Sequence, residues 1–106
     1  MTAARIAEIN DAARTSFIGC RVVITQGIAT SIADLDGLYA KVRAFDNFTE
    51  RNDPYGEHDF GSVEHEGQAV FWKFDYYDLD LLMHSPDPTD PAVTCRVLTI
   101  MLAEEY

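Results

Sequence analysis

The segment 58–77 constrains the fold more than any other part of the chain, because apolar residues recur at every second position along its second half. A period of two places alternate side chains on opposite faces of a β-strand. Glu66-Gly67 interrupts the segment, and glycine supplies the positive φ that a tight hairpin needs. The sequence therefore predicts a hairpin of two strands, at about 58–65 and 69–77. The predicted core face of the second strand carries Val70, Trp72, Phe74 and Tyr76, and its other face carries Phe71, Lys73, Asp75 and Tyr77.

Apolar residues at helical spacing predict three helices, and a short β-branched run predicts one further strand. Thr2 caps the first helix, Thr30 or Ser31 caps the second, and Asp90 followed by Pro91 begins the third. Periodicity does not decide whether the segment 79–83 extends the sheet or forms a turn. The predicted helices span about 2–16, 31–46 and 91–104, and the predicted strand spans 21–26.

These elements define the expected fold class. A chain of 106 residues holds one modest core, so we expect a single domain over residues 1–106. The order helix, strand, helix, hairpin, helix predicts an α+β fold. We expect a small, mostly antiparallel sheet of three strands, or four if the segment 79–83 joins it, with about three helices packed on one face.

Acidic residues are concentrated in one part of the chain. The chain has 18 acidic and 8 basic residues, for a net charge of −10. Twelve of the acidic residues and only two of the basic ones lie between Asp46 and Asp90, so the whole net charge belongs to the hairpin and its flanking loops. This charge disfavours direct binding to a phosphate backbone, which calls for a basic surface. The amphipathic helices lack a basic face, which also disfavours membrane binding.

We predict that the acidic segment contains a partner-binding surface. Carboxylates facing lysine and arginine steer association and make affinity depend on salt, and exposed aromatic residues are favoured contact residues. Two plainer alternatives stay open, in which the acids only maintain solubility and the aromatic residues form a minor core under the loops. The predicted partner-binding residues are Asp53, Tyr55, Glu57, Asp59, Glu64, Glu66, Asp75, Tyr77, Asp78 and Asp80.

A catalytic or metal-binding role is the competing hypothesis. The segment 52–59 is rich in carboxylates and includes His58, a combination that can hold a divalent metal or transfer protons. The spacing matches no established motif, and the sequence contains no phosphate-binding glycine loop or nucleophile elbow. We therefore expect no enzymatic activity, no catalytic residue, no metal and no cofactor. The alternative is a small metal-binding protein or enzyme centred on Asp53, Glu57, His58 and Asp59.

The cysteines and the start of the sequence favour a cytoplasmic location. Cys20 and Cys95 are far apart in sequence and form no CxxC pair, so we expect reduced thiols that pack as small hydrophobic residues. The first six residues contain no apolar stretch of the kind found in signal peptides.

Four sequence blocks are specific in their order and content: Asn52–Gly61, Phe71–Asp78, Ser85–Pro88 and Val97–Tyr106. They resemble the blocks of a small bacterial family of domains of unknown function, which is often encoded on plasmids and other mobile elements of proteobacteria. The resemblance extends from about Ile6 and implies no enzymatic activity. Small acidic proteins of mobile elements resemble, as a class, inhibitors of restriction and CRISPR complexes.

Together these observations predict a non-enzymatic acidic binding protein that inhibits a host defence or nucleic-acid-handling complex, by charge mimicry or steric block. The expected partner is a protein with a basic nucleic-acid-binding surface. A third possibility is a plasmid accessory module whose acidity only confers solubility. The sequence does not predict the oligomeric state.

Overall fold

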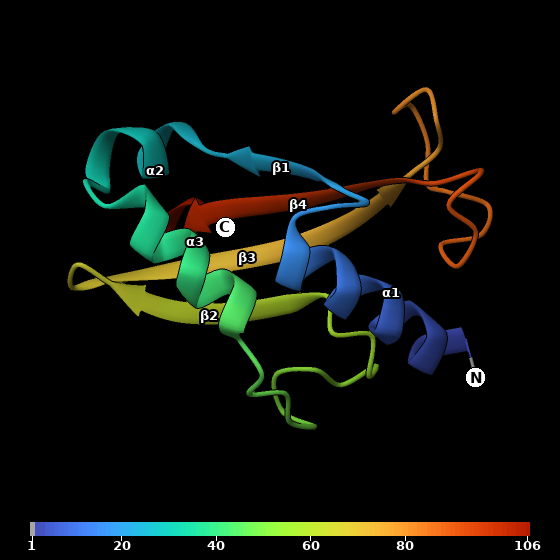
Figure 1. The fold of residues 1–106 in the computed structure, drawn as a ribbon, viewed down its shortest axis with the longest axis horizontal. Coiled ribbons are helices and arrows are strands. Elements are labelled where there is room, and N and C mark those ends of the chain that lie inside the picture. The colour runs from blue at the N-terminus through green and yellow to red at the C-terminus, as the bar shows by residue number, and fades with distance from the viewer. Residues whose placement is uncertain (1) are drawn as a thin grey trace.

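The computed structural model describes residues 2–106, and they form an α+β fold with a four-stranded mixed sheet (Figure 1). The strand order is β1-β4-β3-β2, with β1 parallel to β4 and the other neighbours antiparallel. The fold class is as predicted, with four strands. The elements are α1 (Thr2–Ser16), β1 (Arg21–Ile24), α2 (Gln26–Ser31), α3 (Leu35–Ala44), β2 (Phe60–His65), β3 (Gln68–Tyr77), β4 (Cys95–Leu102) and the 3₁₀ turn η1 (Ala103–Glu105).

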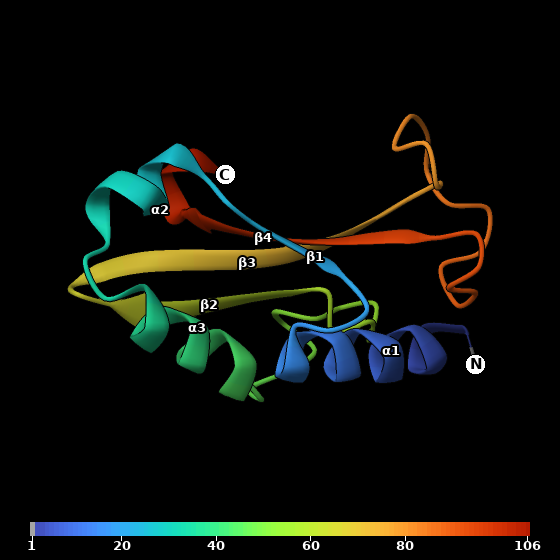
Figure 2. The same cartoon turned by 45° about the horizontal axis from the view of Figure 1, so that its top comes forward.

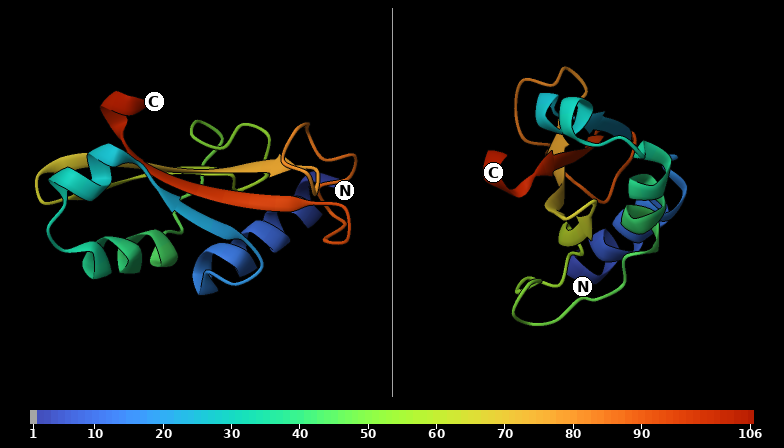
Figure 3. Two further views of the ribbon diagram at one scale, coloured as in Figure 1. Left: turned by 90° about the horizontal axis from the view of Figure 1, so that it is seen from above. Right: turned by 90° about the vertical axis from the view of Figure 1, so that its left-hand side faces the viewer.

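The helices α1 and α3 lie end to end along one side of the sheet, and α2 lies near the end of β1 (Figure 2 and Figure 3). The alternation predicted for the second hairpin strand is confirmed, because all four residues of its apolar face are buried. They pack with residues of β4 and α3 that are also buried. This core includes Val70, Trp72, Phe74, Tyr76, Leu98, Ile100, Leu38 and Val42.

The predicted hairpin is confirmed, and its turn requires unusual backbone angles. Glu66 and Gly67 both have positive φ, at 55° and 75°, the combination typical of a tight two-residue turn. The segment 79–83, which periodicity left undecided, is a loop of bends and turns and does not join the sheet.

The predicted C-terminal helix is wrong, because residues 95–102 form the strand β4. This strand lies between β1 and β3, and apolar residues occur on both of its faces, with Leu98 and Ile100 toward the core and Val97 and Met101 on the other face. Such a run satisfies helical spacing as well as alternation, which is why its period is ambiguous. The cap signal at Asp90 is real but local, since the Asp90 carboxylate accepts a hydrogen bond from the Ala92 amide at 2.9 Å within a turn.

The predicted second helix is also wrong in its extent, because the chain forms two shorter helices there. Thr25 caps α2 and Asp34 caps α3, each by accepting a hydrogen bond from a backbone amide. Between the helices, the carboxylate of Glu66 accepts the amides of Ala33 and Asp34 at 3.1 and 2.7 Å. Because Glu66 belongs to the hairpin turn, more than 30 residues away in sequence, the sequence around residues 31–34 does not predict this break.

Within residues 2–106, no helix combines the length and the apolar composition that crossing a membrane requires. Cys20 and Cys95 are free thiols, and both are half-buried rather than fully packed in the core.

Candidate protein-binding face

One face of the sheet is packed against helices, whereas none of the helices in residues 2–106 covers the other, which we call the open face. The register places Phe71, Lys73 and Asp75 of β3 on this face, beside Val97 and Thr99 of β4. These side chains are half-buried. The alternation that builds the core therefore also builds an exposed surface of mixed apolar and charged character.

An aromatic cluster lies on the open face near the C-terminal end of the chain. Phe60 of β2 and Phe71 of β3 meet edge to face, with ring centroids 5.0 Å apart. Tyr106 turns back over both rings, with each centroid 5.6 Å away. Such edge-to-face contacts are favourable beyond simple burial.

A hollow of about 390 Å³ lies next to this cluster. Phe60 and Tyr106 contribute to its walls, together with Tyr55 from the loop that precedes β2. Lys73 and Asp75 also line it and form an ion pair, with Nζ 2.5 Å from Oδ2. The hollow thus combines aromatic walls with charged groups, as surfaces that contact other proteins often do.

Asp59 lines the same hollow and has a perturbed carboxyl group. Burial raises the pKa of Asp59, and the nearby carboxylates of Glu57, Asp53 and Asp75 raise it further. A raised pKa means that the charged form of this carboxyl group is disfavoured, mainly because burial removes it from water and secondly because of repulsion by those carboxylates. A cation brought to this site would relieve that repulsion, so the site favours a basic group.

Five of the ten predicted partner-binding residues belong to this side of the molecule. Tyr55, Asp59 and Asp75 line the hollow. By alternation from its neighbours in the register, Glu64 of β2 lies on the open face, and Tyr77 does so at the far end of β3. The structure brings Tyr55, Asp59 and Asp75 together around the hollow, whereas Glu64 lies near the hairpin turn and Tyr77 at the opposite end of β3.

Three of the other predicted carboxylates are engaged within the fold. Asp53 is buried and accepts the His58 amide at 3.1 Å, and Glu66 accepts the amides of Ala33 and Asp34 between α2 and α3. Asp78 accepts the amide of Leu82 at 3.0 Å. Part of the hydrogen-bonding capacity of these three carboxylates is therefore used within the fold.

Glu57 and Asp80 complete the predicted set. Glu57 accepts a hydrogen bond from the Tyr76 hydroxyl at 3.1 Å, on the helix side of the sheet, whereas Asp80 is exposed in the loop after β3. The predicted surface is therefore divided between structural and exposed carboxylates.

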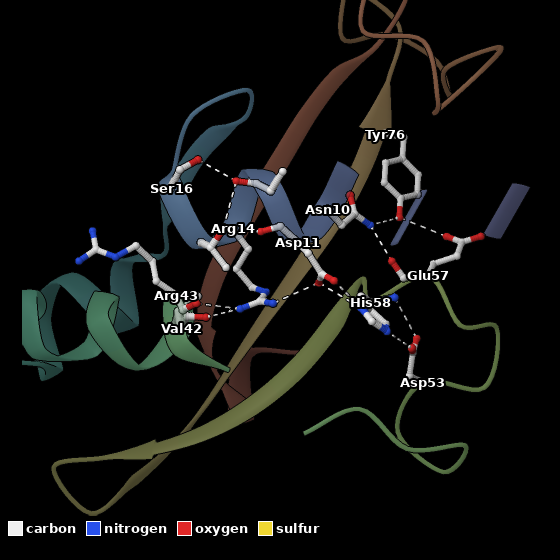
Figure 4. Close-up of polar contacts among 12 residues, drawn as sticks. Asn10, Asp11, Arg14, Ser16, Val42, Arg43, Asp53, Glu57, His58 and Tyr76 are labelled. Carbon is white, nitrogen blue, oxygen red and sulfur yellow. Dashed lines mark hydrogen bonds and ion pairs between the residues drawn. The ribbon is translucent and has the colours of Figure 1, made fainter. Parts of the chain in front are cut away.

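Glu57 belongs to a buried polar network beneath α1 (Figure 4). The Asn10 amide donates to the Tyr76 hydroxyl at 2.8 Å and to the Glu57 carbonyl at 3.0 Å, and its oxygen accepts Nε of Arg96 at 2.7 Å. Burial raises the pKa of Tyr76 far above its usual value, which keeps the hydroxyl neutral. Asn10 is fully buried and gave no sequence signal, because an asparagine in an amphipathic helix is ordinarily exposed.

His58 joins the loop 45–59 to α1 (Figure 4). Its Nδ1 lies 2.9 Å from Oδ2 of Asp11, its Nε2 lies 3.6 Å from Oδ2 of Asp53, and its ring stacks on Phe48 with centroids 3.8 Å apart. Arg14 donates to Asp11 and to the carbonyl of Val42. Sequence reasoning singled out His58 and Asp53 but missed Asp11, which lies 47 residues from His58.

The catalytic alternative finds little support at His58. A hollow of about 470 Å³ lies beside this residue, but both ring nitrogens already face carboxylates and one ring face is covered. A histidine that acts as a base needs one nitrogen free to reach a substrate. Among residues 2–106, no group of three or more histidine, cysteine or carboxylate side chains is arranged to hold a metal. The arrangement at His58 fits the anchoring of a loop.

Fold and surface together define a small acidic α+β protein whose sheet is covered on one side and exposed on the other. The chain belongs to the family described as proteins of unknown function (DUF3768), whose model matches residues 24–105. The predicted resemblance to a family of domains of unknown function is thereby confirmed, although the match begins after α1 and not at Ile6. Comparisons with curated proteins and with solved structures find no significant match.

Proposed function

We propose that this protein is a non-enzymatic binding protein whose open face binds a basic surface of a partner protein. The observation that carries the proposal is a hollow with aromatic walls that holds Asp59, a half-buried carboxyl group whose pKa is raised first by burial and then by the nearby carboxylates. Basic side chains of a partner would lower this repulsion and pack against Tyr55 and Tyr106.

The distribution of charge supports a partner that ordinarily binds nucleic acid. The net charge of −10 lies in the segment 46–90, which supplies the hairpin and the loops before and after it. A surface of this sign attracts the lysine and arginine residues with which proteins hold phosphate groups. The carboxylates of this chain would then occupy such a surface by charge mimicry or by steric block.

The resemblance described above suggests what such binding achieves. In our proposal the protein is encoded on a bacterial mobile element, acts in the cytoplasm, and inhibits a host defence complex of the restriction or CRISPR type. Charge segregation and class analogy support this part of the proposal. Under the plainer alternative of a solubilising surface, binding would be insensitive to these carboxylates.

A capture experiment with two matched variants tests the proposal. The open-face variant carries Asp59→Asn, Glu64→Gln and Asp75→Asn, and the control carries Glu8→Gln, Asp36→Asn and Asp46→Asn, all on the helix side of the molecule. Both variants remove three negative charges, but only the first removes them from the open face or its hollow. Each protein is used to capture host proteins at low and moderate salt, and the bound proteins are identified by mass spectrometry.

The proposal predicts that the parent and the control capture the same nucleic-acid-handling protein at low salt. It also predicts that moderate salt and the open-face variant each abolish that capture. Equal capture by the two variants would contradict the proposal and leave the acidic segment as a solubilising surface.

A further inference from the structure

The loop between β3 and β4 exposes an unusual number of large apolar side chains. Leu79 is 62% exposed, Leu82 is 81% exposed and Met83 is 71% exposed, and Leu81 between them is 41% exposed. Single exposed apolar residues are common on protein surfaces, but a contiguous group marks an interaction site. We call these four residues the apolar knob.

Hydrogen bonds hold the knob in place. The Asp78 amide donates to the Met83 carbonyl at 2.8 Å, and the Asp78 carboxylate accepts the amides of Leu82 and Met83 at 3.0 and 3.4 Å. A β-bridge between Tyr77 and His84 closes the base of the loop. The apolar side chains are therefore presented on a fixed backbone, which lowers the entropic cost of binding through them.

The knob lies on the same side of the sheet as the open face. In Figure 2 the chain leaves β3 and rises on the side opposite α1 and α3, which is also the side of the C-terminal end. A partner seated on the open face is therefore within reach of the loop. We propose that the apolar knob is the anchor that inserts into an apolar pocket of that partner, flanked by lysine or arginine residues. This inference rests on the function proposed above.

Charge identifies the occupant as a different protein with a basic rim. Asp80 is exposed beside the knob, within a segment that carries the entire net charge of −10. Contact between the knobs of two copies would bring like charges together, and an anionic lipid surface would repel the same segment. A basic rim around an apolar pocket is complementary to both features of the loop.

Photo-cross-linking at the knob tests the inference directly. A benzophenone amino acid replaces Leu82 in the full chain, which is expressed in the host and irradiated, and cross-linked peptides are sequenced. The same probe at Ile18, which is 77% exposed on another part of the molecule, is the control. Binding of the captured partner, once purified, is then measured for a knob variant (Leu79→Ser, Leu82→Ser and Met83→Ser) and for an Ile18→Ser control.

The inference predicts a cross-link from position 82, and none from position 18, to an apolar pocket of the partner beside lysine or arginine. The knob variant should bind the partner at least tenfold more weakly, with an unchanged dependence on salt. No cross-link to another protein, a cross-link to a second copy, or full affinity of the knob variant would each overturn the inference.

The two proposals fail in different ways. If binding is sensitive to salt and is lost in the open-face variant but unchanged in the knob variant, only the inference about the anchor is wrong. If position 82 cross-links to a partner whose binding depends neither on salt nor on the open-face carboxylates, the proposed function is wrong and the apolar contact is supported.

Discussion

The two faces of β3 carry side chains from one continuous strand, yet they differ in almost every physical respect. Trp72, Phe74 and Tyr76 point toward α1 and α3 and are buried, while Phe71, Lys73 and Asp75 between them are half-exposed. The covered face is densely packed, as the stability of a small domain requires, and the indole Nε1 of Trp72 is buried there without a hydrogen-bond partner among residues 2–106. The open face holds a hollow with a repelled carboxylate. One strand thus separates residues that maintain the fold from residues available to a partner.

The largest expected effect of a substitution is in the centre of the covered face. Trp72→Ala removes a fully buried side chain and should cost about 3–5 kcal/mol of unfolding free energy, because it leaves a cavity. Phe71→Ala, on the adjacent but open face, should cost about 1 kcal/mol. Urea unfolding followed by circular dichroism measures both values. Equal costs would contradict the division between the two faces.

The buried polar network should be the next most sensitive part of the covered side. Asn10→Ala leaves Nε of Arg96 and the Tyr76 hydroxyl without their shared partner, and we expect a loss of about 2–3 kcal/mol. Thr15→Ala, at an exposed position of the same helix, is the control and should change stability by less than about 0.5 kcal/mol. A small effect of Asn10→Ala would mean that water replaces the asparagine.

Substitution of His58, which anchors the loop 45–59 to α1, should lower the free energy of unfolding by an intermediate amount and should loosen mainly this loop. His58→Ala removes the contact with Asp11 and the stacking on Phe48, and we expect a cost of about 1–2 kcal/mol. Hydrogen exchange should become faster in residues 46–59 while the protection of β3 and β4 is retained. If His58 served chemistry instead of anchoring, its removal would leave the exchange of this loop unchanged.

The smallest expected effects concern the carboxyl groups of Asp59 and Glu66, whose contributions to the free energy of unfolding should change with pH in opposite directions. The pKa of Asp59 is raised, so its contribution favours the folded state at acidic pH and is lost as pH rises above the unfolded value. Asp59→Asn should therefore stabilise the protein at pH 7 by about 0.5 kcal/mol or less, since solvent screens this partly exposed group.

Glu66 provides the opposite case. Hydrogen bonds from the amides of Asp34 and Ala33 lower its pKa, so its contribution is present above the unfolded pKa and is lost as pH falls through the folded pKa. Glu66→Gln should therefore destabilise the protein at pH 7, and the difference should disappear under strongly acidic conditions. Thermal unfolding of both variants between pH 3 and about 7 measures these signs. The same sign for both carboxylates would contradict their assignment to structural and open positions.

How well the sequence predicted the fold depended on how local each signal was. The alternation from Val70 to Tyr76 and the turn at Glu66-Gly67 lie within one hairpin, and both predictions were confirmed. The strand β4 was mistaken for a helix because apolar residues on both of its faces, such as Leu98 and Met101, obscure the period of two. The break between α2 and α3 depends on Glu66, which is more than 30 residues away in sequence.

The same distinction applies to the candidate site. Charge counting located the acidic segment, and the structure places Tyr55, Asp59 and Asp75 around one hollow. Counting could not show that Asp53, Glu66 and Asp78 are engaged by backbone amides, because those amides become neighbours only in the fold. It also could not find the contact between Asp11 and His58.

The most direct test of the open face is the salt dependence of binding to the captured partner. The affinity of the parent, the open-face variant and the charge-matched control is measured by calorimetry between about 50 and 200 mM salt, a range over which screening changes strongly. We predict a steep loss of affinity with salt for the parent and the control, and weak binding with a shallow slope for the open-face variant. Identical affinities and slopes for all three proteins would contradict the assignment of partner binding to the open face.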